Sequence, residues 1–254
     1  MTGFVTIKVA ATRGSAPRDA GTSMRVFADH IEGTIGGGAL EWDAIRSARE
    51  MLETGNRHAT RTMPLGPDLG QCCGGSVTLE FSREPATVAQ TGPALWIWGA
   101  GHVGRAIAGV MAPLQDRQIT LIDTTPQRMP DALPAGVSPL VAADPLRVVA
   151  HAPRTGDHLI VTYSHDLDLA LCDALLRHGF ASAGLIGSAT KWVRFRTRLT
   201  AMGHTSAQIS RIACPIGDPS LGKHPQAIAV GVVAALISAS AYRAANFTTG
   251  ERTG

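Results

Sequence analysis

Two adjacent cysteines between glycines, Cys72 and Cys73, have the most recognisable chemistry in this sequence, in the segment GQCCGG at residues 70–75. Neighbouring side chains along an extended chain point in opposite directions, so an adjacent pair seldom serves a core. Glycines leave room for a ligand to approach the backbone. Thiolates are soft metal ligands and also nucleophiles for sulfur transfer. The pair therefore indicates a thiol-containing ligand site, and a buried, inert thiol beside a tight turn is the alternative.

The other cysteines, Cys172 and Cys214, are isolated, and no CxxC motif accompanies them. A zinc or iron–sulfur site is therefore not indicated. The chain opens without a cationic segment followed by an apolar run, which is the pattern of an export signal. We therefore expect reduced thiols and a cytoplasmic protein.

The second chemical signal is a glycine fingerprint, GAGHVG at residues 99–104, between a predicted strand and a predicted helix. Asp123 ends the following predicted strand, at the distance typical of a ribose-binding acid, which favours NAD over NADP. The helix N-terminus offers unpaired N–H groups to a phosphate. A nucleotide or another phosphorylated cofactor would satisfy this pattern, and a Rossmann domain without a dinucleotide is the alternative. His102 inside the loop is unusual for hydride-transfer enzymes.

Further polar stretches predict ligand contacts in both halves of the chain. In the first half, Arg18 offers a planar anion-binding fork in the turn at residues 14–21. Residues 36–38, three glycines ahead of a helix, predict an anion cradle or else a flexible connector. In the second half, residues 164–168 follow a strand and open a helix. Either Ser164 or Asp166 is expected to cap that helix.

Two lysines complete this set of candidate residues. Lys191 lies near the start of a helix that follows Ser188, where the helix dipole disfavours a cation unless an anion is close, so we expect it to bind a phosphate. Lys223 lies in the turn-rich loop before the last helix, and we expect it to reach a ligand.

The elements that position these residues fall into two groups. Up to residue 81 the pattern is strand-rich, with strands expected at 4–9, 23–27 and 76–81 and one helix at 42–54 whose apolar stripe begins at Trp42. After residue 93, strands at 95–98, 119–122, 158–163 and 183–186 alternate with helices, later ones at 166–177, 190–202 and 226–242. This alternation predicts a Rossmann-like, doubly wound parallel sheet behind a small strand-rich α/β domain. We place the domains at 1–83 and 95–245, a linker at 84–94 and a tail at 246–254.

Composition excludes several classes of function. The 254 residues are 44% hydrophobic and 17% charged, which is typical of a folded protein. The net charge of +3 is dispersed, so no nucleic-acid partner is expected. The longest apolar stretch, residues 227–241, falls short of the roughly 20 residues that span a membrane, so no membrane partner is expected either.

Seven segments in this order resemble the XdhC family of xanthine dehydrogenase accessory factors, over nearly the whole chain: residues 14–21, 33–41, 69–75, 99–104, 164–168, 186–191 and 214–225. The resemblance implies a small N-terminal domain followed by a Rossmann domain. It also implies a carrier that binds molybdenum cofactor (molybdopterin), protects it during sulfuration and delivers it to an apo xanthine dehydrogenase-like enzyme. Relatives carry a helical segment before the first strand, whereas this sequence begins almost at that strand.

By this resemblance Cys72 or Cys73 contacts the molybdenum of the cofactor, and no residue is expected to be catalytic. The expected partners are the molybdenum enzyme, a cysteine desulfurase and a second copy of the chain, since two-fold dimers are the commonest assembly. An NAD-dependent oxidoreductase with a thiol-containing site is the alternative, and a sulfur-transfer enzyme is a third reading. The expected cofactor-binding residues are Arg18, Gly36, Gly37, Gly38, Gln71, Cys72, Cys73, Gly74, Gly75, Gly99, Gly101, His102, Gly104, Asp123, His165, Asp166, Ser188, Lys191 and Lys223.

Overall fold

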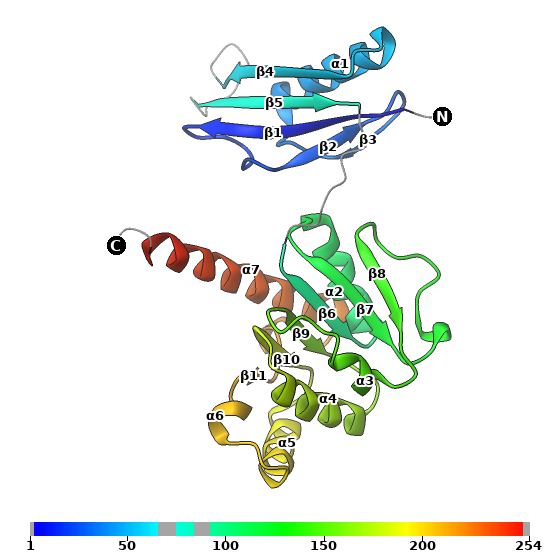
Figure 1. The fold of residues 1–254 in the computed structure, drawn as a ribbon, viewed down its shortest axis with the longest axis vertical. Coiled ribbons are helices and arrows are strands. Elements are labelled where there is room, and N and C mark those ends of the chain that lie inside the picture. The colour runs from blue at the N-terminus through cyan, green and yellow to red at the C-terminus, as the bar shows by residue number, and fades with distance from the viewer. Residues whose placement is uncertain (1–2, 66–74, 84–91, 251–254) are drawn as a thin grey trace. The chain divides into compact units, whose positions relative to one another are not determined.

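The structure is a computed structural model that describes residues 3–65, 75–83 and 92–250, with the side chains of the last helix described through residue 239. It divides the chain into two units, Met1–Val88 and Ala89–Gly254 (Figure 1). Residues 84–91, most of the expected linker, lie outside the described part of the chain.

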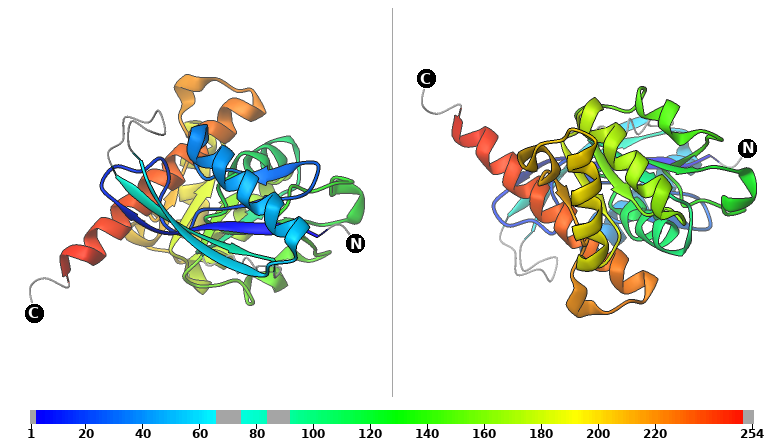
Figure 2. Two further views of the ribbon diagram at one scale, coloured as in Figure 1. Left: turned by 90° about the horizontal axis from the view of Figure 1, so that it is seen from above. Right: turned by 90° about the horizontal axis from the view of Figure 1, so that it is seen from below.

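The first unit is an antiparallel sheet with one helix against it (Figure 2). Its strands are ordered β3-β2-β1-β5-β4. Apolar side chains alternate inward along β1 and β5 and meet the buried side chains of the helix, among them Leu40, Ala44 and Met51, to form one core. The elements are β1 (Val5–Arg13), β2 (Ser23–Val26), β3 (Ile31–Gly33), α1 (Gly38–Thr54), β4 (His58–Pro64) and β5 (Ser76–Ser82).

Helix α1 begins one turn earlier than predicted, and its buried stripe differs. Trp42 was expected to start that stripe, but it is 72% exposed. Leu40 and Ala44 are buried instead, together with Ile45 and Ala48 of the predicted stripe. Strands β3 and β4 were not predicted, and most of their residues are exposed or half-buried, which leaves little apolar alternation to detect.

The second unit is a six-stranded sheet in which every pair of neighbouring strands is parallel, in the order β11-β10-β9-β6-β7-β8. This is the order of a dinucleotide-binding Rossmann fold, and it confirms the predicted fold class. The strands are β6 (Ala94–Trp98), β7 (Gln118–Asp123), β8 (Val137–Val141), β9 (Asp157–Ile160), β10 (Ser182–Leu185) and β11 (Ile212–Ala213).

Helices cover both faces of this sheet. Ile97 packs in a core with α2 and α7, and its neighbour Trp98 points to a second core with α3, α4 and α5. The helices are α2 (His102–Met111), η2 (Ala112–Leu114), η3 (Pro126–Arg128), α3 (Pro145–Val149), α4 (His165–His178), α5 (Ala189–Ala201), α6 (Ser206–Ile209), η4 (Pro219–Leu221) and α7 (Pro225–Gly250).

Several elements of the second unit differ from expectation. Strands β8 and β11 were not predicted; both lie at edges of the sheet, β8 contains Pro139, and β11 has only two residues. Helix α7 continues to Gly250, past the residue 245 at which we placed the end of the domain. Among the described residues, no helix combines the length and hydropathy that crossing a bilayer requires.

Candidate functional site

The carboxyl ends of β6 and β9 meet at the centre of the parallel sheet. From β6 the chain crosses to β7 on one side, and from β9 it crosses to β10 on the other. Loops therefore diverge at this point, and a crevice opens between them, which is where ligands bind in open parallel sheets. The glycine fingerprint at residues 99–104 follows β6 and lies in this crevice.

The three fingerprint glycines have different roles. Gly99 has a φ of +120°, and a Cβ there would lie 2.5 Å from the Val161 carbonyl oxygen after β9. A Cβ on Gly104 would collide with the Gly99 carbonyl oxygen, so this glycine allows close packing of helix on strand. Gly101 is different, since a Cβ there would meet no atom within 4 Å. The packing of the unit therefore does not require a glycine at 101.

The space beside Gly101 lies at the start of α2. No side chain caps this helix, and Gly101 itself is the N-cap residue. The first N–H groups of a helix carry partial positive charge and attract phosphate. The open space beside Gly101 lies where a phosphate would approach the first N–H groups of α2. The loop therefore has room for the phosphate of a cofactor.

Asp123 ends β7 as predicted, but its carboxylate is turned toward the glycine loop. One oxygen accepts the Ala100 N–H at 2.7 Å, the other accepts the Thr124 N–H at 2.7 Å, and the side chain is only 4% exposed. In this structure Asp123 holds the loop in place. Its expected contact with a ribose remains a prediction.

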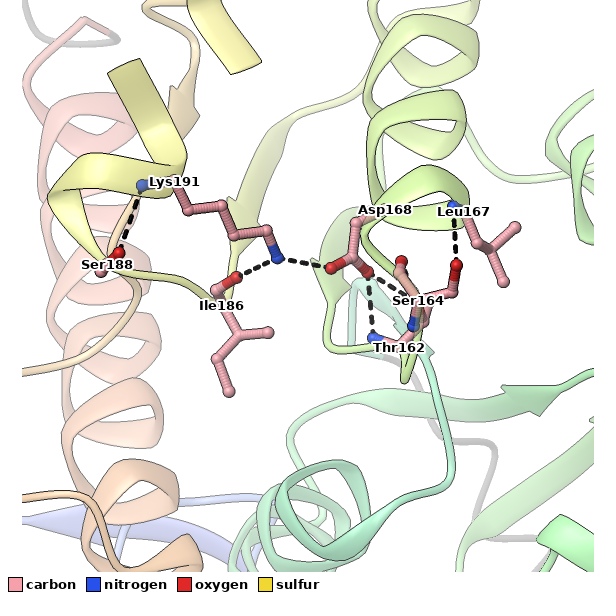
Figure 3. Close-up of polar contacts among 7 residues, drawn as sticks. All are labelled: Thr162, Ser164, Leu167, Asp168, Ile186, Ser188 and Lys191. Atoms are coloured by element: carbon pink, nitrogen blue, oxygen red, sulfur yellow. Dashed lines mark hydrogen bonds and ion pairs between the residues drawn. The ribbon is translucent and has the colours of Figure 1, made fainter. Parts of the chain in front are cut away.

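The loop between β9 and α4 is organised around Asp168 (Figure 3). Ser164 caps α4 by accepting the Leu167 N–H, so the cap is Ser164 and not Asp166. One Asp168 oxygen accepts the Thr162 hydroxyl at 2.7 Å and the Thr162 N–H at 3.2 Å. The carboxylate therefore fixes the backbone directly after β9.

Lys191 pairs with this carboxylate in the structure. Its Nζ lies 2.6 Å from Asp168 Oδ2 and donates to the Ile186 carbonyl at 2.9 Å (Figure 3). The anion that the helix dipole required near Lys191 is thus supplied by the chain itself. Ser188 caps α5 by accepting the Lys191 N–H at 3.2 Å. A phosphate contact by either residue remains a prediction.

The other predicted residues of the second unit are exposed. Asp166 has a long ion pair with Arg198 at 3.4 Å, and His165 and Lys223 are open to solvent. His102 and His224, the neighbour of Lys223, line one cavity of about 420 Å³ between the starts of α2 and α7. The loop before α7 therefore faces α2 across this cavity.

Two thiols lie near the Asp168–Lys191 pair. Burial raises the pKa of Cys172 far above its ordinary value and raises the pKa of Cys214 to about 11. Both thiols are therefore protonated at neutral pH, which makes them poor nucleophiles and poor metal ligands.

In the first unit, the expected ligand loops meet at one end of the sheet. A Cβ on Gly36 would lie 2.7 Å from Pro17 Cβ and 3.4 Å from Arg18 Cγ. A Cβ on Gly75 would collide with the Ser15 carbonyl oxygen. The loop at 14–21 therefore adjoins both Gly36 and Gly75, and Gly75 is the described end of the cysteine segment. Gln71, Cys72, Cys73 and Gly74 themselves lie outside the described residues.

The glycine cradle at residues 36–38 holds an anion of the chain itself. Glu41 Oε2 accepts the N–H groups of Ile35 at 2.9 Å and Gly37 at 3.2 Å, and the Thr34 hydroxyl at 2.5 Å. Burial alone would raise the pKa of Glu41, but these hydrogen bonds outweigh it and lower the pKa. The segment does bind a carboxylate, and an external anion there would have to displace Glu41.

Comparison with known protein families assigns both units of the chain to one family. The profile of the XdhC Rossmann domain matches residues 95–236, and that of the XdhC and CoxI family matches residues 2–63. The chain belongs to the XdhC family. The uncharacterized protein YqeB of Escherichia coli K12 is 29% identical over 239 residues, or 92% of this chain and 43% of that protein. The XdhC chain thus spans less than half the length of this curated relative.

A solved structure supports the fold of the whole XdhC chain. A protein from Bacillus halodurans described as a xanthine dehydrogenase superposes with a TM-score of 0.69 at 16% sequence identity, covering 95% of this chain and 93% of that one. At this identity the likeness concerns the fold alone.

Two features of this XdhC chain had no signal in its sequence. Arg117 forms an ion pair with Asp157, and both side chains are 1% exposed, near the amino ends of β7 and β9 and away from the crevice. At the crevice, the guanidinium of Arg128 lies over the ring of Tyr163. Each pair joins separate loops or strands, so only the fold brings the partners together.

In the part of the XdhC chain that the structure describes, no group of three or more histidine, cysteine, aspartate or glutamate side chains could hold a metal ion. The expected contact of Cys72 or Cys73 with molybdenum falls outside that part. The phosphate contact expected at residues 99–104 and the molybdenum contact expected at Cys72 or Cys73 both remain predictions.

Proposed function

We propose that this protein is an accessory factor that binds molybdenum cofactor, protects it during sulfuration and delivers it to an apo xanthine dehydrogenase-like enzyme. Membership of the XdhC family, matched in both units, suggests a role in molybdenum enzyme maturation and is the observation that carries the proposal. The open space at Gly101 beside an uncapped helix supports it, because molybdopterin carries a phosphate.

Each unit offers its own candidate contact with the cofactor, and each contact is proposed separately. The loop at residues 99–104 binds the phosphate through backbone N–H groups at the start of α2, and His102 and Lys223 are further proposed contacts. Cys72 or Cys73 contacts the metal end, in a segment whose Gly75 end adjoins the loop of Arg18. When bound, the cofactor supplies the molybdenum centre that the client enzyme uses.

The proposed partners follow from the same role. A carrier must meet its client, a xanthine dehydrogenase-like enzyme, and a sulfur donor such as a cysteine desulfurase. We also propose a homodimer in the cytoplasm, where the thiols of Cys72 and Cys73 stay reduced.

The test is retention of molybdopterin and molybdenum after desalting, for wild type, Cys72→Ala and Cys73→Ala, each with and without excess NAD. We expect near-stoichiometric retention that collapses in one cysteine variant and is indifferent to NAD. Cys214→Ala is the matched control and should retain the cofactor, because the raised pKa of that thiol keeps it protonated. Retention at the wild-type level in both cysteine variants would reject the thiol contact.

An NAD-dependent oxidoreductase is the second candidate, favoured by the strand order of the sheet, which is that of dinucleotide-binding proteins. In that case wild type would retain no molybdopterin and would bind NAD. That result would reject the carrier function.

A further inference from the structure

An arginine and a tyrosine stack at the crevice of the second unit. The guanidinium carbon of Arg128 lies 3.6 Å from the centre of the Tyr163 ring, a spacing typical of stacked planes. Both side chains face solvent, since Tyr163 is 60% exposed and the Arg128 side chain 42%. A stacked pair that faces solvent leaves planar surface available to a third partner.

Neighbouring residues place this pair beside the glycine loop. Tyr163 follows Thr162, which lines a small recess together with Gly99 and Asp123. Arg128 Nε lies 3.8 Å from Asp123 Oδ1. The pair therefore lies next to residues that line the recess, in the loops that follow β7 and β9 on either side of β6.

Arg128 is fixed to the glycine loop through Arg105. The Arg105 guanidinium donates to the Arg128 carbonyl at 2.7 Å and to the Ala100 carbonyl at 2.6 Å. The position of Arg128 is therefore linked to the loop that offers N–H groups to a phosphate. A ligand with a phosphate at Gly101 and a planar group at Tyr163 would contact two surfaces that Arg105 connects.

We propose that Arg128 and Tyr163 form a stacking platform for the planar nitrogen heterocycle of a phosphorylated ligand held by the glycine loop. Heterocycles stack on tyrosine rings and on guanidinium planes, and such contacts tolerate different rings because each presents a π face. The shared chemistry is a phosphate ester joined to a heterocycle. If the proposed function holds, on which this identification rests, the heterocycle is the pterin of molybdopterin; in the alternative it is the adenine of NAD.

The test is equilibrium dialysis of the full chain with isolated molybdenum cofactor, with NAD and with AMP. Tyr163→Ala should weaken binding of the ligand that wild type binds by about tenfold, within the range of base–aromatic stacking. Tyr163→Phe keeps the ring and should stay within about twofold of wild type. Arg128→Lys keeps the charge without the plane and should also weaken binding. Leu114→Ala, which truncates an exposed side chain after the far end of α2, is the control.

The outcomes separate this inference from the proposed function. Cofactor binding by wild type that Tyr163→Ala leaves unchanged would overturn the platform and leave the carrier intact. Binding of NAD or AMP but not molybdopterin, weakened by Tyr163→Ala, would support the platform and reject the carrier. Equal losses in Tyr163→Phe and Tyr163→Ala would assign the effect to the hydroxyl and overturn stacking. Binding of none of the three ligands by folded wild type would overturn both.

Discussion

The ammonium of Lys191 lies 2.6 Å from the carboxylate of Asp168, and their side chains are only 10% and 1% exposed. The pair connects the start of α4 with the start of α5, and so links the loops that follow β9 and β10. Because Asp168 also accepts two hydrogen bonds from Thr162, one carboxylate organises the crevice edge on that side.

Removing Lys191 should be severely destabilising. In Lys191→Met the Asp168 carboxylate stays buried without its cation, which typically costs about 3–5 kcal/mol. The double variant Asp168→Asn with Lys191→Met removes the buried charge and should recover much of the loss. Urea unfolding followed by tryptophan fluorescence in a Trp42→Phe background reports on the second unit alone, since the remaining tryptophans lie there. Lys223→Met, at an exposed lysine, is the control; an equal loss in both single variants would contradict the argument.

The glycines of the fingerprint should separate folding from binding. Gly99→Ala places a Cβ against the Val161 carbonyl at positive φ and should destabilise the unit by several kcal/mol. Gly101→Ala has an ordinary φ of −71° and open space, so its free energy of unfolding should change by less than about 1 kcal/mol while ligand binding falls at least tenfold. Thermal melts and dialysis on the same samples check both. Unimpaired binding by Gly101→Ala would place the phosphate elsewhere.

The free energy of unfolding of the second unit should decrease as the pH falls from neutral to mildly acidic, because of His158. Its Nδ1 lies 3.3 Å from the indole N–H of Trp98, which can only donate, so the imidazole accepts there and is neutral. Burial lowers its pKa from 6.5 to about 4, although the Pro153 carbonyl and the Asp157 charge act in the opposite direction.

Because the folded pKa lies below the unfolded one, the unfolded chain binds the extra proton between these values. The contribution of neutral His158 to the free energy of unfolding is complete above about pH 6.5. It is lost as the pH falls toward 4, by about 3 kcal/mol in total. In His158→Asn this part of the pH dependence of urea unfolding should disappear, whereas it should persist in His224→Asn, at an exposed histidine. An unchanged slope in His158→Asn would assign the effect to other groups.

Glu41 should behave as a replaceable internal anion. Glu41→Ala frees the N–H groups of Ile35 and Gly37 and should cost about 1 kcal/mol, as loss of a helix cap does. Hydrogen exchange of these two amides should accelerate, and sulfate should slow it again more than chloride at equal ionic strength. Glu53→Ala, at an exposed glutamate near the other end of α1, should show neither effect. Sulfate without effect in Glu41→Ala would mean that the freed cradle does not accept external anions.

The fold of the second unit could be predicted because its signals are local. The glycine loop, the strands on either side and the regular alternation with helices each lie within short stretches of sequence. The same pattern of a strand followed by a helix start predicted that Ser164 and Lys191 lie near the carboxyl end of the sheet.

The partners of those residues could not be predicted, because they come from other loops. Lys191 was interpreted as a phosphate ligand from the helix dipole alone, whereas its anion, Asp168, belongs to the preceding helix. Glu41 reaches back to backbone N–H groups ahead of its own helix, which the glycines alone do not indicate. Tyr163 and Arg128 follow different strands, and only the strand order brings them together.

The hairpin of β4 and β5 closes at the two residues that flank the cysteine segment, so the sheet does not depend on the length of that segment. The Leu65 N–H donates to the Gly75 carbonyl at 2.7 Å, so the chain leaves and re-enters the sheet at one closed point. The entropy of closing a loop grows only slowly with its length. Residues 66–74 can therefore lengthen, shorten or change in composition while the sheet that bears them persists. The thiols of this segment and the sheet that bears it can therefore be altered separately.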